Sequence, residues 1–125
     1  MSEQKNIIPL GRQDFDRDLG KLEAELILMS GLVEQAIFNA LNALKSRDID
    51  KSQKVIDEDD NIDQTELEIE RSCIELIRRE APMAGDLRRI VASLHIAGEL
   101  ERIGDYAEGI AKISITMGGQ PPLKE

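Results

Sequence analysis

The apolar residues of this 125-residue chain recur at spacings that are typical of long α-helices. Proline occurs at only four positions, so residues 10–81 and 83–120 are free of the residue that interrupts helices. In the first stretch the apolar residues follow one another at steps of four and three, which predicts a helix packed almost parallel to its neighbours. These residues are Phe15, Leu19, Leu22, Leu26, Met29, Val33, Ala36, Ala40 and Leu44.

Residues 46–48 form a short connection to a second helix, which should return antiparallel to the first. Asp48 is its expected N-cap, and Asp50 places a negative charge in its first turn, where an anion is stabilising. The second helix should end before Pro82, because proline is tolerated at the start of a helix and not inside one. Its core line has one apolar residue per heptad, at Val55, Ile62, Ile69 and Leu76.

A third helix is expected from about residue 83 to residue 116. Its predicted core line consists of Leu87, Ile90, Val91, Leu94, Ala97 and Gly98. A second apolar line lies on the opposite side, at Ala92, Ile96, Ile103 and Ile110. This second line predicts either packing against another copy, in a homo-oligomer such as a homodimer, or the wide apolar arc of a central bundle helix.

These patterns predict an all-α fold, an antiparallel up-down-up three-helix bundle of long helices. The bundle should occupy residues 12–117, between an N-terminal segment (residues 1–11) and a tail (residues 118–125) whose glycine and proline are typical of linkers. Three glycines in the third helix each cost about 1 kcal/mol of helix propensity relative to alanine. Close helix approach, or room at an acidic face, would explain them: Gly98, Gly104 and Gly109.

Twenty-five acidic residues against sixteen basic ones give a net charge of −9, which argues against nucleic acid as a partner. The single cysteine, Cys73, excludes an internal disulfide framework and fits the reducing environment of the cytoplasm, where we expect the protein to be. We expect Cys73 itself to be a small residue of the core. The N-terminus has no apolar signal core, and no stretch approaches the roughly 18 apolar residues of a membrane span, so a soluble protein is expected. A glycine-rich phosphate loop and a nucleophile with an identifiable base are both missing from the sequence, so no enzymatic activity is predicted.

The acidic residues are concentrated in the second helix, where residues 48–80 contain twelve acids and five bases, a net charge of −7. A run of acids is usually a solvated helix face. On a helical wheel, however, one stripe of acids lies inside the apolar arc of this helix: Asp59, Asp63, Glu66 and Glu70. The third helix repeats the pattern with Glu101, Asp105 and Glu108.

Carboxylates in an apolar arc require protonation, solvent or a bound cation, because desolvation and neighbouring negative charges disfavour the ionised form. We favour a cation. The spacings Asp59-x-x-x-Asp63 and Glu101-x-x-x-Asp105 each place two carboxylates one helical turn apart, so that a metal ion can bridge them. Oxygen donors suit hard ions such as Mg²⁺, Mn²⁺, Ca²⁺ or Fe³⁺. His95 lies about 120° from Glu101 on the wheel and is not expected to be a ligand.

The two acidic motifs, together with the strings at residues 82–90 (PMAGDLRRI) and 100–105 (LERIGD), resemble one repeat of the PhoU family over residues 12–118. PhoU proteins regulate phosphate signalling in bacteria and usually carry two such repeats in tandem. The resemblance implies a three-helix repeat with a surface cluster of Fe, Mn or Mg. The implied ligands are Asp59, Asp63, Glu101 and Asp105, to which the helical wheel adds Glu66, Glu70 and Glu108.

The resemblance also implies negative regulation of the phosphate-starvation response and of phosphate transport. The implied partners are a PhoR-type sensor histidine kinase, held in its inhibitory state when phosphate is plentiful, and a phosphate-specific ABC transporter, with membrane association only through these partners. One alternative is a structural helical accessory domain of a transporter without a metal function. A carboxylate metal-storage or di-iron protein is disfavoured because the chain lacks Glu-x-x-His pairs.

Overall fold

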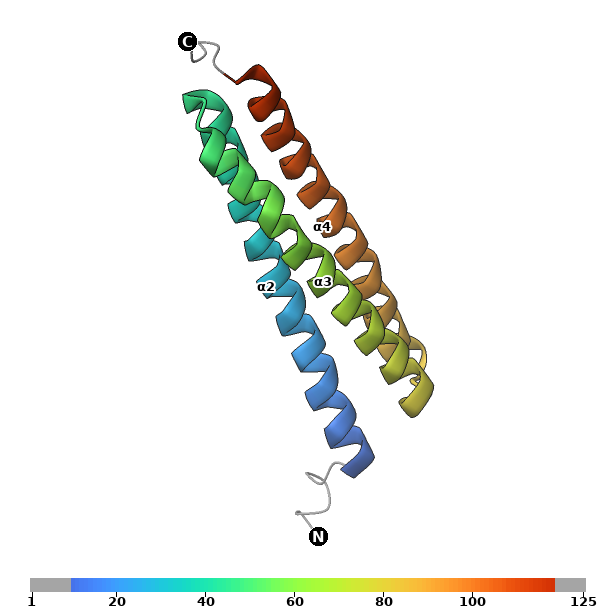
Figure 1. Ribbon diagram of the computed structural model, residues 1–125. Coiled ribbons are helices and arrows are strands. Elements are labelled where there is room, and N and C mark those ends of the chain that lie inside the picture. Colours follow the sequence, from blue (N-terminus) through green and yellow to red (C-terminus); the bar gives the residue numbers. More distant parts are fainter. Residues whose placement is uncertain (1–9, 119–125) are drawn as a thin grey trace.

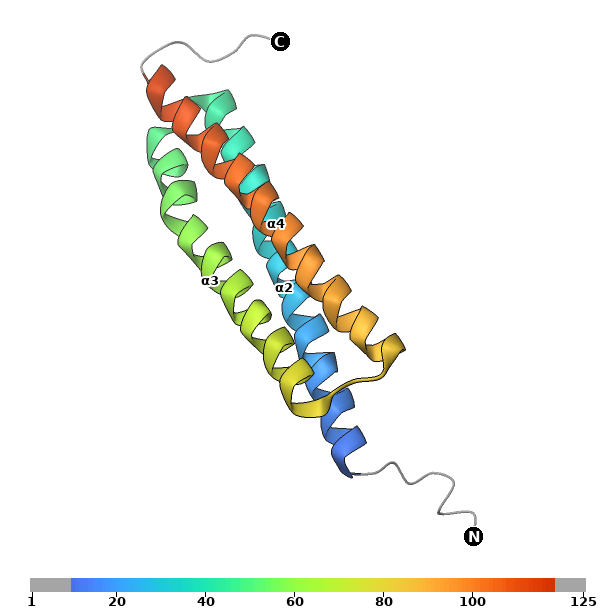
Figure 2. The same ribbon diagram turned by 90° about the vertical axis from the view of Figure 1, so that its right-hand side faces the viewer.

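In the computed structural model the chain folds into three long helices, α2 (Leu10–Ser46), α3 (Ile49–Glu80) and α4 (Ala84–Met117), which run up, down and up (Figures 1 and 2). Each helix contacts the other two. This arrangement confirms the predicted all-α bundle. The structure describes residues 10–118, so the expected N-terminal segment and tail lie outside the described residues except at positions 10, 11 and 118.

The connection between α2 and α3 has the predicted cap. Asp48 adopts an extended backbone conformation, and its carboxylate accepts a hydrogen bond from the Lys51 backbone N–H at 3.0 Å. The preceding residue, Arg47, has a φ of 57°, and this left-handed conformation ends the helix before it. Asp50 lies in the first turn of α3, as expected.

The connection between α3 and α4 forms around the predicted proline. The C-cap residue Ala81 has a φ of 42°, and its N–H donates to the Ile77 carbonyl at 3.2 Å. Pro82 then keeps the chain out of helical geometry until α4 begins at Ala84. Arg79 near the end of α3 contacts Asp18 of α2 at 2.5 Å, which ties this end of the bundle together.

The core is aliphatic and follows the predicted lines of α2 and α3. It includes Cys73, which is fully buried as expected, and burial raises the pKa of its thiol to about 11. The prediction of Leu44 is wrong, because Ala43 is the fully buried residue and Leu44 is half-buried. Ala43 keeps the seven-residue spacing from Ala36, whereas Leu44 breaks it. The main buried cluster combines Phe15, Leu19, Leu22, Leu26, Met29 and Val33 of α2 with Ile62, Ile69, Cys73 and Leu76 of α3 and Ile90 and Ala97 of α4.

The predicted core line of α4 is partly wrong. Leu87 and Val91 are 36% and 50% exposed. The buried face of α4 instead has one large residue, Ile90. Its other members are small: Ser93, Ala97, Gly104, Ala107, Ala111 and Ser114. At about 100° per residue, this face is centred roughly 75° from Glu101. Glu101 is half-buried at the edge of this face, whereas Asp105, about 115° from its centre, is exposed and not inside the apolar arc as expected.

Among the described residues one helix, α2, is long and apolar enough to cross a membrane by length and composition, although the sequence led us to expect no such stretch. An 18-residue window within Arg12–Ser46 has a mean hydropathy of 1.3. Isolated polar residues interrupt every long apolar run of this helix. One such helix is weak evidence for a membrane segment. Only 22% of that window is buried in the bundle, so α2 exposes much of its apolar surface.

Candidate metal centre

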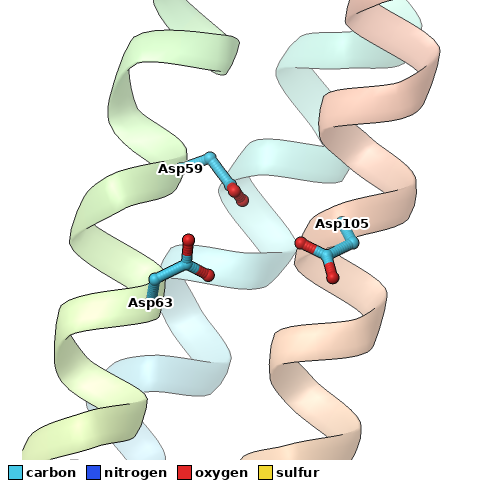
Figure 3. Close-up of side chains that lie close together, drawn as sticks. All are labelled: Asp59, Asp63 and Asp105. Atoms are coloured by element: carbon cyan, nitrogen blue, oxygen red, sulfur yellow. The ribbon is translucent and has the colours of Figure 1, made fainter.

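Three aspartates from two helices converge between α3 and α4 (Figure 3). Asp59 and Asp63 are one turn apart on α3, and Asp105 faces them from α4, with α2 behind. One carboxylate oxygen from each aspartate lies within 4.8 Å of the other two. The antiparallel arrangement of α3 and α4 thus joins the two acidic motifs that are far apart in the sequence.

A glycine beside the aspartates allows this approach. A Cβ atom at Gly104 would lie 3.2 Å from Cγ2 of Ile62 and 3.5 Å from Oδ1 of Asp59, so a larger residue would press directly on the site. Close helix approach therefore explains Gly104. It does not explain Gly98 or Gly109, where an added Cβ would meet nothing within 4 Å.

Asp59 is the most buried member of the group, with 5% of its surface exposed. Burial first, and then the negative charges of Asp63, Glu108 and Asp105, together raise the pKa of its carboxyl to about 7. Asp63 is half-buried, and one of its carboxylate oxygens is buried without a hydrogen-bond partner. Its pKa is also raised, first by burial and then by the charges of Asp105 and Asp60. Both carboxylates thus lack the stabilisation that a buried charge needs.

The other predicted ligands surround this group without belonging to it. Glu101 is half-buried, and its pKa is raised to about 7 by burial, by a hydrogen bond with Asp105 and by the charge of Asp105. Glu66 has a raised pKa because of burial and the charges of Glu70 and Asp63. Glu108 forms an ion pair with Lys112 at 3.3 Å. The structure therefore brings three of the four motif residues together and places Glu101 next to Asp105.

No lysine or arginine among residues 10–118 lies within ion-pair distance of Asp59, Asp63 or Asp105. Lys112, which lies one turn after Glu108 on α4, forms its ion pair with Glu108. His95 is exposed and lies ten residues before Asp105 on α4, about 15 Å along the helix axis. The donor set is therefore all oxygen, which fits Mg²⁺, Mn²⁺, Ca²⁺ or Fe³⁺ and does not fit a site of imidazole and thiolate.

Sequence analysis missed the contribution of Asp60, whose charge helps to raise the pKa of Asp63. The signal was present in the run of four consecutive acids at residues 57–60. Asp60 lies outside the acidic stripe on the wheel, but residues three apart on a helix are neighbours, and this i, i+3 spacing brings its charge close to Asp63.

Comparison with known proteins places the whole site inside one domain. The PhoU domain matches residues 26–114. The chain is 42% identical over 108 residues to the phosphate-specific transport system accessory protein PhoU homolog of Aquifex aeolicus, covering 86% of this chain and 49% of that protein. Identity to the Escherichia coli accessory protein PhoU is 33% over 81% of this chain and 42% of that protein.

The fold comparison agrees. The crystal structure of PhoU from Pseudomonas aeruginosa superposes with a TM-score of 0.80 at 37% identity, covering 82% of this chain and 49% of that one. The chain spans about half the length of the curated relatives that it matches.

Proposed function

The chain belongs to the PhoU family, and we propose that it is an accessory regulator of phosphate transport whose α3–α4 carboxylates bind a hard metal ion. The observation that carries this proposal is the match of the PhoU domain to residues 26–114, which contain every carboxylate of the candidate site. The relatives compared above are named as accessory proteins of a phosphate-specific transport system. PhoU is thus a family of accessory and regulatory proteins.

In the proposed metal site, Asp59, Asp63 and Asp105 supply carboxylate oxygens from two helices. Glu101 is the fourth ligand in this proposal because the Glu101-x-x-x-Asp105 motif resembles that of PhoU proteins, and it lies one turn from Asp105 on α4. Glu66, Glu70 and Glu108 form an outer ring of carboxylates that adds negative potential. A bound Fe, Mn or Mg ion supplies the positive charge that no neighbouring lysine or arginine provides to the three aspartates, and it links α3 to α4.

We extend the proposal to the signalling partners. The chain would act in the cytoplasm, on a phosphate-specific ABC transporter and on a PhoR-type sensor histidine kinase, and reach the membrane only through them. When phosphate is plentiful it would hold the kinase in its inhibitory state and so repress transcription of phosphate-starvation genes. The names of the relatives support the transporter partner. The kinase partner follows from the resemblance of the acidic motifs to those of PhoU proteins.

Expression of the chain in a bacterium that lacks its own PhoU tests this function. With a phosphate-starvation reporter gene, the wild-type chain should restore repression in phosphate-rich medium. The triple variant Asp59→Asn, Asp63→Asn, Asp105→Asn should fail to restore it, whereas Asp57→Asn on the polar face of α3 should act like wild type. Reporter expression as high with the wild-type chain as with an empty vector would contradict the proposal.

One observation supports an alternative function, an accessory domain of a transporter without a metal. Asp59 and Glu101 each have a pKa of about 7, so protonation at neutral pH could relieve their repulsion instead of a cation. Calorimetric titration of the chelator-treated chain with Mn²⁺ and Mg²⁺ separates the two. Saturable heat that disappears in the triple variant supports the metal site, and no heat with either ion supports the alternative.

A further inference from the structure

An apolar surface is exposed on the outer side of α3 and α4, where these helices run side by side in front of α2 (Figure 3). We call it the α3–α4 face. It contains five large side chains that are 36% to 55% exposed: Leu67, Ile74 and Ile77 of α3 and Leu87 and Val91 of α4. On helical wheels the α3 members lie within about 80° of one another and the α4 members within about 40°.

The register of the two helices brings these side chains to one end of the bundle. A Cβ atom at Gly104 of α4 would lie 3.2 Å from Ile62 of α3, so these two residues are at the same level. Ile74 follows Ile62 by twelve residues and Val91 precedes Gly104 by thirteen, which is about 18 to 20 Å along either axis. The other three members lie within two helical turns of this level. The five form one patch, unlike the single apolar side chains that are common on protein surfaces.

Two glutamates of α3 border the patch and have no basic partner. Glu66 and Glu70 are half-buried, and no lysine or arginine among residues 10–118 forms an ion pair with either. Arg78, at the outer edge of the face, is paired with Glu75. A half-buried carboxylate has lost part of its hydration, so a cation brought to it by a partner is stabilising.

Gly98 leaves open space beside these glutamates. It lies six residues before Gly104 and therefore at the level of Glu66, on the same side of α4 as Leu87 and Val91. A Cβ atom at Gly98 would meet nothing within 4 Å, so packing inside the chain does not require glycine, which costs about 1 kcal/mol relative to alanine. The missing side chain lets a partner approach the backbone of α4 closely.

The charge of the face selects its occupant. Residues 48–80 carry −7 of the total charge of −9, and the acids of α3 and α4 lie along this face. A second copy would bring its own acids against these, and nucleic acid or an anionic lipid surface would add phosphates, so all three are repelled. The groove between two nearly parallel helices accommodates a further helix. From Leu87 to Glu101 the face is about 21 Å long, the length of a helix of about 14 residues.

We propose that the α3–α4 face binds a basic amphipathic helix of a partner protein. The apolar residues of that helix pack on Ile74, Leu87 and Val91, and its lysines or arginines contact Glu66 and Glu70. This binding surface adds to the proposed function and does not rest on the metal, because the two glutamates lie outside the group of three aspartates.

Two neighbouring glutamates provide a matched test. The probe is a synthetic helical peptide of about 14 residues, with leucine on one side and lysine on the other. Its binding to the full chain is measured by calorimetry with a chelator present, so that the result is independent of the metal titration. Glu70→Lys should raise the dissociation constant at least about tenfold. Glu68→Lys makes the same change of charge about 160° away, on the exposed polar side of α3, and should raise it less than about threefold.

The apolar part of the face has its own matched pair. Ile74→Ser should also raise the dissociation constant at least about tenfold, whereas Leu28→Ser, at a 70% exposed position of α2, should leave it unchanged. Far-ultraviolet circular dichroism establishes that each variant is folded.

Three results would overturn the proposal. The first is the absence of saturable binding of the lysine peptide to the wild-type chain, or equally tight binding of a peptide with glutamate in place of lysine. The second is an equal effect of Glu70→Lys and Glu68→Lys. The third is sedimentation of the wild-type chain with phosphatidylcholine vesicles that Ile74→Ser abolishes, which would assign the face to a membrane surface.

Discussion

At the scale of single residues, the decisive feature is the burial of Asp59 among other acids. Its carboxyl is 5% exposed and is surrounded by Asp63, Asp105 and Glu108, none of which can compensate its charge. A buried anion without a counter-charge costs folding free energy. The same arrangement favours a cation, because binding a positive ion converts mutual repulsion into attraction at several carboxylates at once.

The proposed site predicts that metal retention depends on the aspartates of both helices. Asp63→Asn combined with Asp105→Asn should remove most of the bound metal measured by elemental analysis of the purified chain, because the two changes take away one ligand from each side of the site. Asp57→Asn removes an acidic residue of α3 outside the group and should leave the metal content at the wild-type value. A double variant with wild-type metal content would show that the metal lies elsewhere.

The stability of the chelator-treated chain should fall as the pH rises from about 4 to about 7. The pKa of Asp59 is about 7 in the folded chain and 3.8 in a free side chain, so within this window the folded state binds more protons than the unfolded state. Raising the pH then favours unfolding. Urea unfolding in the presence of a chelator at pH 5 and pH 8 measures the difference.

Asp59→Asn isolates the contribution of this carboxyl to the pH dependence. The variant should lose much of the decrease and be more stable than wild type at pH 8, by about 1 to 3 kcal/mol. Glu101, whose pKa is also about 7, accounts for part of the remaining decrease. A pH profile in Asp59→Asn identical to that of wild type would contradict this assignment.

At the scale of elements, the contact between α3 and α4 depends on a glycine. Gly104→Val should destabilise the fold by about 1 to 3 kcal/mol and lower metal content, because its side chain would overlap Ile62 and push against Asp59. Gly98→Ala on the same helix has open space and should stabilise the chain by about 0.5 to 1 kcal/mol. Thermal unfolding of both variants provides the comparison, and a Gly104→Val as stable as wild type would contradict the close approach.

At the scale of the whole molecule, the bundle separates two kinds of surface. The carboxylates lie where α3 meets α4, and most of the exposed large apolar residues lie on α2 and α4. The proposed ion site and most of the exposed apolar residues therefore lie on different parts of the bundle. An ion bound between α3 and α4 also joins two helices through side chains distant in the sequence, so it should stabilise the bundle as any ligand of the folded state does.

Local sequence was sufficient for much of this organisation. The helix bounds could be predicted within a few residues because Asp48 caps α3 and Pro82 separates α3 from α4, and both effects act over neighbouring residues. The spacing of apolar residues predicted the core line of α2 except at Leu44. There the more hydrophobic leucine was chosen over Ala43, which is the buried residue. The acidic residues of α3 were also visible as a stripe, since helical geometry alone defines which side chains share a face.

Only the tertiary structure decided which face of α4 is buried and which carboxylates meet. Small residues such as Ala97, Gly104 and Ala107 face the core because they let the helices approach closely, although they are less hydrophobic than Leu87 and Val91. The register of α3 against α4 then brings Asp105 to Asp59 and Asp63 and leaves Glu101 beside them. Helical periodicity determines the faces of each helix separately, whereas distances between helices depend on how all three pack together.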